Sequence, residues 1–260
     1  MPSNFDSASK QYDEVFTFSN IGKAQRQRVY NYINPIIGSS KKLNILEVNC
    51  GTGEDAILFG GLGHDVIATD ISEEMIAVAN AKEHPKNVIF KIQDINTLSL
   101  GLFDINFDLV FSNFGGLNCL SKEQLSIFIK ESSKILNPKG KLVLVIMPKK
   151  CLWERFYFSL KGNYKKAKRR NTSENIIVNV DGTNVKTWYY NPKDIVSLSE
   201  ALYKTKKIKP IGLAIPPSYL ENSFLAKSPL LYILKGIDRI VNGSFWAKYA
   251  DHFLIELEKK

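Results

Sequence analysis

The chain has 260 residues, of which 44% are hydrophobic, 23% charged and 11% aromatic, and its formal net charge is +9. A chain of this length can bury a core without disulfides or metal, and its composition excludes disordered, collagen-like and coiled-coil proteins. The three cysteines, Cys50, Cys119 and Cys151, lie far apart in the sequence. They indicate free thiols in a reducing compartment rather than a disulfide framework or a zinc site.

The sequence carries no targeting signal that we recognise. The amino-terminal segment lacks a continuous apolar stretch, so we expect no signal peptide. No apolar run reaches the roughly 18 residues that a membrane-spanning helix needs. We therefore predict a cytoplasmic protein without a membrane span. No cluster of His, Cys, Asp or Glu has the spacing of metal ligands, and we expect no metal site.

The positive charge is concentrated in the second half of the chain. Residues 1–147 carry 14 basic and 16 acidic side chains, whereas residues 148–260 carry 21 basic and 10 acidic ones. Between Lys149 and Arg170 there are nine basic residues and a single acid, Glu154. This asymmetry indicates either an anionic partner for the basic part or a solvated helix face in a lysine-rich chain.

The first half alternates short apolar runs with helical patterns, after a predicted helix over residues 21–37. The expected strands cover residues 43–48, 65–70, 87–92, 107–113 and 141–147. The expected helices cover residues 54–62, 73–83 and 122–136. Ser72 and Ser121 are predicted to cap the last two helices, and residues 137–140 to form a turn. Strands without polar interruptions, alternating with helices, are typical of a parallel sheet that is covered on both faces.

After residue 148 the pattern changes. A basic, aromatic segment over residues 151–170 is predicted to be helical. A β-hairpin is expected from strands over 176–180 and 184–190, joined by residues 181–183. A helix over 193–203, a strand over 207–215, a helix over 229–241 and a strand over 252–258 are expected to follow.

A glycine-rich loop follows the first predicted strand, in the sequence NCGTGEDA. Gly51 and Gly53 let a ligand approach bare backbone there, and the following helix supplies N–H donors and positive potential. Asp70 ends the next strand, where its carboxylate can accept hydrogen bonds from both hydroxyls of a ribose. The alternative is an ordinary strand–loop–helix turn with a solvated acid. The strand context and the downstream acids favour a bound ligand.

Two cofactors are compatible with this loop. Gly51, Gly53 and Ala56 fit the dinucleotide fingerprint G-x-G-x-x-G/A. Glu47, four residues before the first glycine, would repel a pyrophosphate but suits a ligand with an ammonium group, such as S-adenosylmethionine. Asp94, just after the third strand, either accepts a hydrogen bond from an adenine amino group or only forms a turn.

Taken in order, these motifs resemble those of class I S-adenosylmethionine-dependent methyltransferases of the small-molecule type, of the 11/25 group. ILEVNCGTG is similar to the first motif of this family, ATD to the second, QDI to the third and DLVFSNFGGLN to the fourth. The resemblance covers roughly residues 5–147. It implies an α/β, Rossmann-like, doubly wound, mainly parallel sheet of seven strands in the order 3-2-1-4-5-7-6, with strand 7 (residues 252–258) antiparallel.

The resemblance also implies a cofactor site. It places the methionine moiety of S-adenosylmethionine against Glu47 and the glycine loop, the ribose against Asp70 and the adenine against Asp94. The full set of implied cofactor-binding residues is Tyr12, Glu47, Asn49, Cys50, Gly51, Thr52, Gly53, Asp70, Ile71, Met75, Asp94, Ile95, Asn113 and Phe114. The family usually has glycine where this chain has Asn49, and asparagine tolerates a left-handed backbone better than most residues.

On this basis we divide a single methyltransferase domain (1–260) into four parts. They are an N-terminal helical cap (1–42), a cofactor-binding core (43–148), a lid that selects the substrate (149–191), and the end of the sheet (192–260) with a helical insertion over 216–250. The lid is expected to present a set of aromatic side chains beside its charges. This set is Trp153, Phe156, Tyr157, Phe158 and Tyr164.

The implied activity is methyl transfer from S-adenosylmethionine to a small-molecule or carrier-bound acceptor, with S-adenosylhomocysteine as product. The sequence shows no clear general base; Glu154 and His252 are weak candidates, and His252 is expected to face the core, whereas His64 is expected to be exposed. Alternatives are an RNA methyltransferase, a catalytically silent cofactor-binding protein and an NAD enzyme. Residues 112–115 lack the Asn/Asp-Pro-Pro-aromatic motif of enzymes that methylate exocyclic base nitrogens, so we do not expect a nucleic-acid acceptor.

Overall fold

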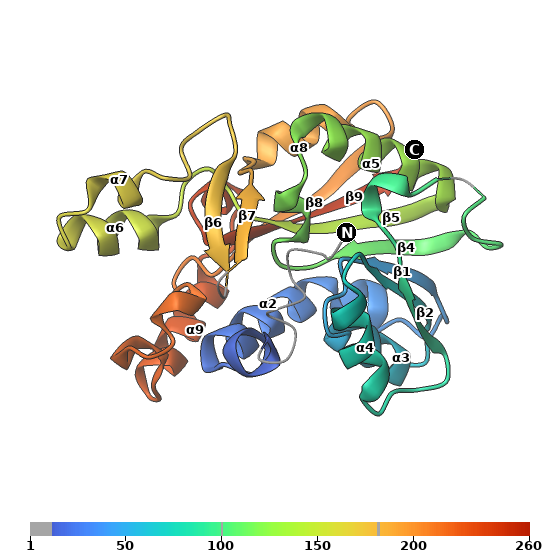
Figure 1. Cartoon of the computed structure of the whole chain (residues 1–260), viewed down its shortest axis with the longest axis horizontal. Helices are drawn as coiled ribbons and strands as arrows, with labels where there is room; N and C mark the ends of the chain where they lie inside the picture. Colours follow the sequence, from blue (N-terminus) through green and yellow to red (C-terminus); the bar gives the residue numbers. More distant parts are fainter. Residues whose placement is uncertain (1–11, 100, 181–182) are drawn as a thin grey trace.

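The computed structural model describes residues 12–99, 101–180 and 183–260. Seven strands form one sheet in the order β3-β2-β1-β4-β5-β9-β8 (Figure 1). Their bounds are Asn44–Val48 (β1), Asp65–Asp70 (β2), Val88–Ile92 (β3), Phe107–Ser112 (β4), Leu136–Ile146 (β5), Tyr203–Ile211 (β8) and His252–Lys259 (β9). Strands β1 to β5 are parallel to one another, and β9 is antiparallel to both β5 and β8. The predicted sheet order and the reversed last strand are confirmed.

Helices cover both faces of this sheet because successive strand residues point to opposite sides. On one face, β1 contributes Ile45 to a core shared with α2 (Asn20–Ile37), α3 (Glu54–Gly61) and α4 (Glu73–Ala81). On the other face, Leu46 joins a core shared with α5 (Lys122–Ile135) and α8 (Pro192–Ser199). Strands buried on both sides need apolar residues at every position, which explains their uninterrupted sequence.

The predicted helix starts are confirmed at two serines. The Ser72 hydroxyl accepts a hydrogen bond from the backbone N–H of Met75 at the start of α4. Ser121 forms a capping box with Gln124 at the start of α5. Each hydroxyl satisfies a backbone donor that the first turn leaves without a helical partner, so these helices begin where the sequence places them.

Three predictions in the core were wrong in detail. Residues 137–140 do not form a separate turn but belong to β5, where a register shift opposite β4 and a φ of 62° at Lys139 absorb the irregularity. Helix α8 ends at Ser199, so β8 begins at Tyr203 rather than at 207. His64 is buried: its ring lies between the Leu43 amide and the Ile37 carbonyl and joins α2 to the first strand.

Residues 149–191, which the sequence analysis expects to form a lid, contain two helices and a hairpin. The single helix predicted over 151–170 is divided into α6 (Leu152–Leu160) and α7 (Tyr164–Ala167), with Gly162 at a φ of 68° between them. Strands β6 (Ile176–Val180) and β7 (Thr183–Thr187) pair antiparallel as predicted, and residues 181 and 182 of the connecting turn lie outside the described residues. In Figure 1, α6 and α7 lie beyond the hairpin at the left.

The remaining elements surround the carboxyl ends of the strands. Helix α9 (Leu230–Ile240) lies at the lower left of Figure 1, below α6 and α7. The short helical turns are η2 (Asp13–Thr17), η3 (Ile95–Thr97), η4 (Gly116–Cys119), η5 (Ser218–Leu220), η6 (Phe224–Ala226) and η7 (Ser244–Lys248). Within the described residues, no helix has both the length and the apolar character required to cross a membrane.

Candidate functional site

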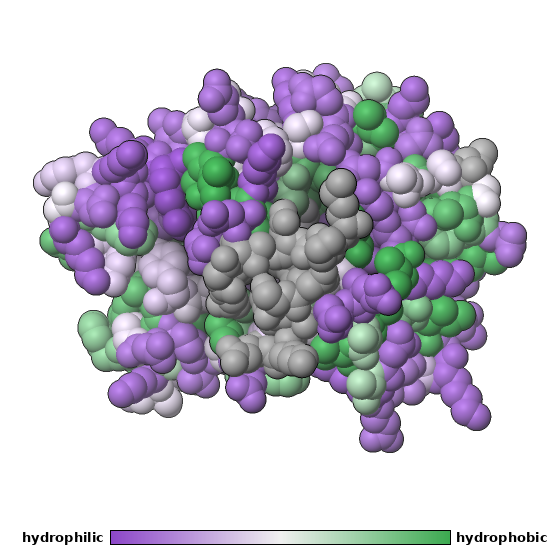
Figure 2. Space-filling model, in the orientation of Figure 1, coloured by the Kyte–Doolittle hydropathy of each residue, from purple (hydrophilic) through white to green (hydrophobic). Residues whose placement is uncertain are grey.

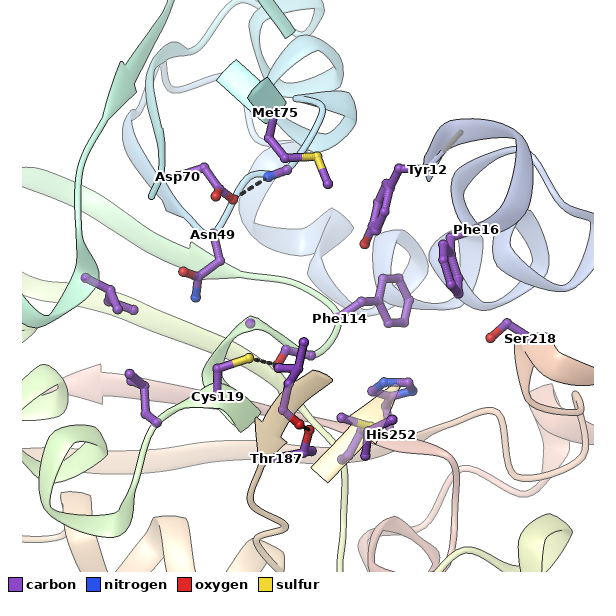
Figure 3. Close-up of a pocket in the computed structure, with 18 of the residues that line it drawn as sticks. Tyr12, Phe16, Asn49, Asp70, Met75, Phe114, Cys119, Thr187, Ser218 and His252 are labelled. Carbon is purple, nitrogen blue, oxygen red and sulfur yellow. Dashed lines mark hydrogen bonds between the residues drawn. The ribbon is translucent and has the colours of Figure 1, made fainter. Parts of the chain in front are cut away.

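A cavity of about 410 Å³ opens at the carboxyl ends of β1, β2 and β4, beneath the hairpin. This is the edge of an open α/β sheet where ligands bind, and its size is that of a small-molecule site. Figure 3 shows Asp70, Asn49 and Met75 on one side of the cavity and Thr187 and His252 on the opposite side. A smaller pocket adjoins it below the glycine loop, and Tyr12, Arg26 and Asn49 line both.

The glycine loop turns through three left-handed residues: Asn49, Gly51 and Gly53 have φ values of 56°, 54° and 81°. Asn49 therefore adopts the left-handed conformation, which asparagine tolerates better than most residues other than glycine. Its side chain also needs space, which Gly116 provides: a Cβ on Gly116 would lie 2.5 Å from the Asn49 Cβ. The Asn49 Nδ2 is buried without a hydrogen-bond partner on the protein. The loop thus presents an unused donor beside the cavity.

Asp70 holds the glycine loop in place from the end of β2. One carboxylate oxygen accepts a hydrogen bond from the Gly51 amide at 2.9 Å, and the other accepts one from the Ser72 amide at 2.9 Å. Both partners are backbone donors beside the cavity wall. A carboxylate fixed by two amides keeps its remaining lone pairs in a constant direction. Asp70 is thus both a support of the loop and an acceptor that faces the cavity.

Below the loop lies a buried charge cluster that sequence reasoning missed in part. Asp55 at the start of α3 accepts the Arg26 guanidinium at 2.6 Å, the Tyr30 hydroxyl at 2.5 Å and the Asn113 amide at 3.0 Å. Glu47 lies beside this cluster at 1% exposure, and its Oε2 has no hydrogen-bond partner. Helix α2 supplies Arg26 from a distant part of the sequence, so local patterns around the motif could not reveal it.

The cluster changes the acidity of Glu47. Burial, together with the negative charges of Asp55 and Asp70, raises the pKa of this carboxyl well above its usual value, although the Arg26 charge acts in the opposite direction. A cation placed beside Glu47 would favour the ionised form. A buried carboxyl with a raised pKa and one oxygen without a hydrogen-bond partner suits a ligand that carries a positive charge.

The amino-terminal turn η2 is attached to the loop by polar contacts. The Thr52 hydroxyl donates to Asp13 at 2.6 Å, and Lys82 of the neighbouring helix contacts the same carboxylate at 2.6 Å. This attachment places Tyr12 and Phe16, whose rings lie 5.2 Å apart, over the cavity. The predicted position of Tyr12 at the mouth of the site therefore follows from a bond between η2 and the glycine loop.

Most of the cofactor-binding residues named from the sequence meet at this site. The larger cavity is lined by Tyr12, Asn49, Gly51, Asp70, Ile71, Met75, Asp94, Ile95 and Phe114. The adjoining pocket is lined by Glu47, Cys50, Thr52 and Asn113. Gly53 lines neither, because its place is at the start of α3. Asp94 also forms a local turn, since its carboxylate accepts from the Asn96 amide at 2.8 Å.

The other half of the cavity differs from the prediction. None of the lid aromatics named from the sequence lines it; the hairpin and its flank supply Val178, Val185, Thr187 and Tyr189, and the basic segment supplies Arg169 alone. Trp153 and Tyr157 instead pack against a separate apolar cluster. Burial raises the pKa of the Cys119 thiol to about 11, so this residue is a neutral part of the wall. The sequence did not identify the hairpin side chains as part of the cavity wall, because an alternation of apolar and polar residues does not show which surface a hairpin covers.

The two candidate bases occupy different environments. Glu154 does not line the cavity; it is buried and bound by Arg169 at 2.6 Å and Arg170 at 2.8 Å. Burial alone would raise its pKa, but the Arg170 charge and the hydrogen bonds from both arginines outweigh this and lower it. A carboxylate held in this way is a poor proton acceptor, which argues against Glu154 as the base.

His252 lines the cavity, although the sequence suggested that it faces the core. Its Nδ1 lies 3.4 Å from Asp251 Oδ2, and its ring packs edge to face against Phe114 at 5.1 Å. Asp251 is buried and fixed by Arg170 at 2.7 Å and by Gln25 at 3.2 Å. Among the described residues, Nδ1 has no hydrogen-bond partner. A proton on Nδ1 would be favoured by the nearby carboxylate and would leave Nε2 as an acceptor.

Comparison with known proteins identifies the core. Residues 45–140 match the family described as "Methyltransferase domain". This part of the chain, which is less than half of it, is similar to a methyltransferase domain. Its first strand, glycine loop and Asp70 are the elements that the sequence motifs indicated, and the seven-stranded order of the surrounding sheet confirms the Rossmann-like, class I architecture. Outside residues 45–140 this family match makes no statement about the chain.

Curated relatives of the methyltransferase domain cover only part of the chain. A malonyl-[acyl-carrier protein] O-methyltransferase of Bacillus anthracis is 30% identical over 129 residues, which are 48% of this chain and 45% of that protein. A demethylmenaquinone methyltransferase of Clavibacter sepedonicus is 29% identical over 143 residues, which are 54% and 55%. The chain thus spans about half the length of the curated relatives that it matches.

Solved structures resemble the chain over nearly its full length. A crystal structure of an S-adenosylmethionine-dependent methyltransferase from Mesorhizobium loti has a TM-score of 0.59 at 13% identity, covering 92% of this chain and 99% of that one. The magnesium protoporphyrin IX methyltransferase of Synechocystis, solved with S-adenosylhomocysteine, has a TM-score of 0.58 at 14% identity, covering 93% and 86%. At these identities the similarity shows that the fold extends beyond the methyltransferase domain.

Proposed function

We propose that the chain is an S-adenosylmethionine-dependent methyltransferase acting on a small or carrier-bound acceptor with an apolar part. The observation that carries this proposal is the continuity of one cavity. It runs from the glycine loop and Asp70, past Phe114, to the apolar wall of the hairpin and to His252. A methyl donor and its acceptor must lie in line and away from water, which a single cavity with two differently lined halves permits.

The residues present fit the proposed cofactor. Asp70 suits the two ribose hydroxyls, and Asp94 and Ile95 line the wall where an adenine would lie. Glu47 Oε2 and Asn49 Nδ2, both buried without a partner on the protein, suit the charged end of a methionine moiety. When bound, S-adenosylmethionine supplies a methyl group on a positively charged sulfur, with a good leaving group already in place.

The chain's own groups provide alignment and enclosure. Tyr12 and Phe16 from η2 cover one side of the cavity, and the hairpin covers the other. Phe114 lies between the two halves and, with the Arg26 guanidinium 5.6 Å from its ring, is held in one orientation. Val178, Val185, Leu120 and Met147 make the acceptor half apolar. This lining favours an aliphatic or aromatic acceptor over a highly charged one.

Calorimetry tests the proposed cofactor directly. Titration of the full chain with S-adenosylmethionine or S-adenosylhomocysteine is expected to release heat with a micromolar Kd, and NADH is expected to give none. At a ligand concentration of 100 times Kd, the unfolding free energy should rise by about 2.7 kcal/mol. Absence of both heat and a thermal shift with S-adenosylmethionine would exclude an enzyme of this class, and binding of NADH alone would indicate an oxidoreductase.

We further propose His252 as the general base for acceptors that must lose a proton, with Asp251 as its positioning residue. His252→Gln is expected to keep the cofactor Kd within about twofold but to reduce methyl transfer to hydroxyl or amine acceptors by about 100-fold or more, the usual contribution of a base. Transfer of a radiolabelled methyl group to a panel of such acceptors measures this. Carbethoxylation of His252 by diethyl pyrocarbonate, mapped by mass spectrometry, tests independently whether Nε2 is accessible. A loss of less than about threefold on every acceptor that is methylated would eliminate His252 as the base.

A further inference from the structure

Helix α9 exposes an apolar stripe. Ile233, Ile237 and Ile240 follow one another at spacings of four and three residues, which places them on one side of the helix. Their exposed fractions are 55%, 43% and 82%, and the neighbouring Tyr232 is 76% exposed. Aliphatic residues with this periodicity normally face a protein core. Here they face away from it.

The side of α9 that contacts the protein buries one acidic side chain and one apolar side chain, Asp238 and Leu231. Asp238 is completely buried, accepts a hydrogen bond from the Ala214 amide at 2.8 Å and lies 3.4 Å from the Arg28 guanidinium. Arg28 also donates to the Asp238 carbonyl at 2.8 Å. The buried apolar contact of the helix comes from Leu231. The Asp238–Arg28 ion pair therefore helps to hold α9 against the protein, while its isoleucine stripe stays exposed.

Neighbouring elements extend this apolar surface. Phe224 in η6, a turn that packs against α9, is 72% exposed, and Phe245 in η7, which follows α9 in the sequence, is 60% exposed. Helix α6 packs against the same small core as α9, through Trp153 and Tyr157, and exposes Phe156 and Leu160. In Figure 2, apolar and hydrophilic residues alternate over the lower left of the molecule, where Figure 1 places α9. Several large apolar side chains on adjoining elements mark an interaction surface.

The charges around the stripe are positive. Between Asn222 and Tyr249 there are four basic residues, and the single acid is the buried Asp238. The basic residues are Lys227, Lys235, Arg239 and Lys248. A second copy of this face would bring like charges together, which costs free energy, whereas an anionic surface would neutralise them. The positive charges therefore favour an anionic surface over a second copy of this chain, two partners that the apolar stripe alone does not distinguish.

We propose that α9, with η6, η7 and the exposed side of α6, binds the surface of an anionic lipid bilayer. The helix would lie in the plane of the interface, with the isoleucine stripe among the acyl chains and the lysines at the headgroups. The surface adjoins the cavity: Ser218 of η5 lines the cavity, and the next residue, Tyr219, packs on Tyr157 and Phe158 of α6. Where the proposed methyltransferase function holds, an apolar acceptor can reach the site from the membrane. The binding itself does not depend on that function.

Vesicle sedimentation with the full chain tests this proposal. Vesicles of phosphatidylcholine with about 30 mol % phosphatidylglycerol, an anionic lipid, are compared with phosphatidylcholine alone. The wild type is expected to bind the anionic vesicles at least about tenfold more tightly, and added salt should weaken the binding. The triple variant Ile233→Ser, Ile237→Ser and Ile240→Ser should lose at least about tenfold in affinity.

A matched control and two contrary outcomes make the test decisive. Ile127 on α5 is also 55% exposed but lies on a helix of the opposite sheet face, so Ile127→Ser should leave vesicle binding unchanged. S-adenosylmethionine binding, measured on the triple variant by calorimetry, reports separately on the methyltransferase site. Equal vesicle binding by the wild type and the triple variant, or no binding by either, would overturn the proposal. A wild-type dimer that the triple variant converts to a monomer in sedimentation velocity would show that a second copy covers the stripe.

Discussion

Asp70→Ala is expected to weaken S-adenosylmethionine binding by about 100-fold. The proposed hydrogen bonds from the ribose hydroxyls to the Asp70 carboxylate would be lost, and each hydrogen bond to a charged group contributes about 1.5–3 kcal/mol, so the expected combined loss is about 3 kcal/mol. The substitution also removes the acceptor for the Gly51 and Ser72 amides, which hold the glycine loop against β2. Both effects weaken cofactor binding.

Calorimetry with S-adenosylhomocysteine measures this loss, and thermal unfolding of the variant shows whether its fold is intact. Asp65→Ala is the matched control, because Asp65 starts the same strand, is 45% exposed and pairs with Lys42 on the surface. Its cofactor affinity should stay within about twofold of the wild type, as expected for an exposed pair. A Kd for Asp70→Ala within about threefold of the wild type would contradict the assignment of Asp70 to the ribose.

Arg170→Met is expected to lower the free energy of unfolding by about 3–5 kcal/mol at neutral pH, the usual effect of removing one partner from a buried ion pair. Arg170 is 5% exposed and joins two buried carboxylates, Glu154 at 2.8 Å and Asp251 at 2.7 Å. It also donates to the Asp251 carbonyl at 2.8 Å. Methionine has a similar length but leaves Asp251 without the charge and hydrogen bonds of Arg170. The lid helix α6 would also lose its attachment to the start of β9.

The free energy of unfolding that Arg170→Met loses should decrease as the pH falls. Burial tends to raise the pKa of Asp251, but His252 and Arg170 outweigh it, so the folded pKa lies below the unfolded value. The pKa of Glu154 is lowered in the same way by the charge and hydrogen bonds of Arg170 and Arg169. A lowered folded pKa stabilises the protein above the unfolded pKa of about 4, and this stability is lost as the pH falls through the folded pKa. The difference between wild type and Arg170→Met should therefore shrink in acid.

Urea unfolding at neutral pH and at about pH 3–4 measures both quantities. Arg155→Met is the control. Arg155 lies in α6, next to Glu154, and its substitution should change the free energy of unfolding by less than about 1 kcal/mol. A loss for Arg170→Met that is equally large at both pH values would mean that packing, and not the buried charges, is the cause. A loss below about 1 kcal/mol would show that the ion pairs contribute little.

The fold was predictable because its signals are local. Uninterrupted apolar strands, the serine caps at Ser72 and Ser121 and the glycine loop all lie within a few residues of the structure that they specify. Details failed where a distant contact decided them. His64 looked exposed because it follows a glycine, yet the end of α2 and the start of β1 enclose it. Residues 137–140 have turn chemistry, but Leu136 and Lys141 on either side of them pair with β4, so β5 continues through them with a register shift.

The sequence by itself determined the glycine loop, the acids at the ends of the strands and the parallel sheet that brings them to one edge, because strand direction places every carboxyl end on the same side. Only the tertiary structure decided which charges meet. Arg26 reaches Asp55 from another helix, Arg170 reaches Asp251 across 81 residues, and the hairpin rather than the aromatic side chains of α6 and α7 lines the cavity. The sequence predicts a helix over 229–241, but only the structure shows that its apolar side is exposed while Arg28 binds Asp238 on the other side. Such pairings depend on distances through space, which residue spacing along the chain does not contain.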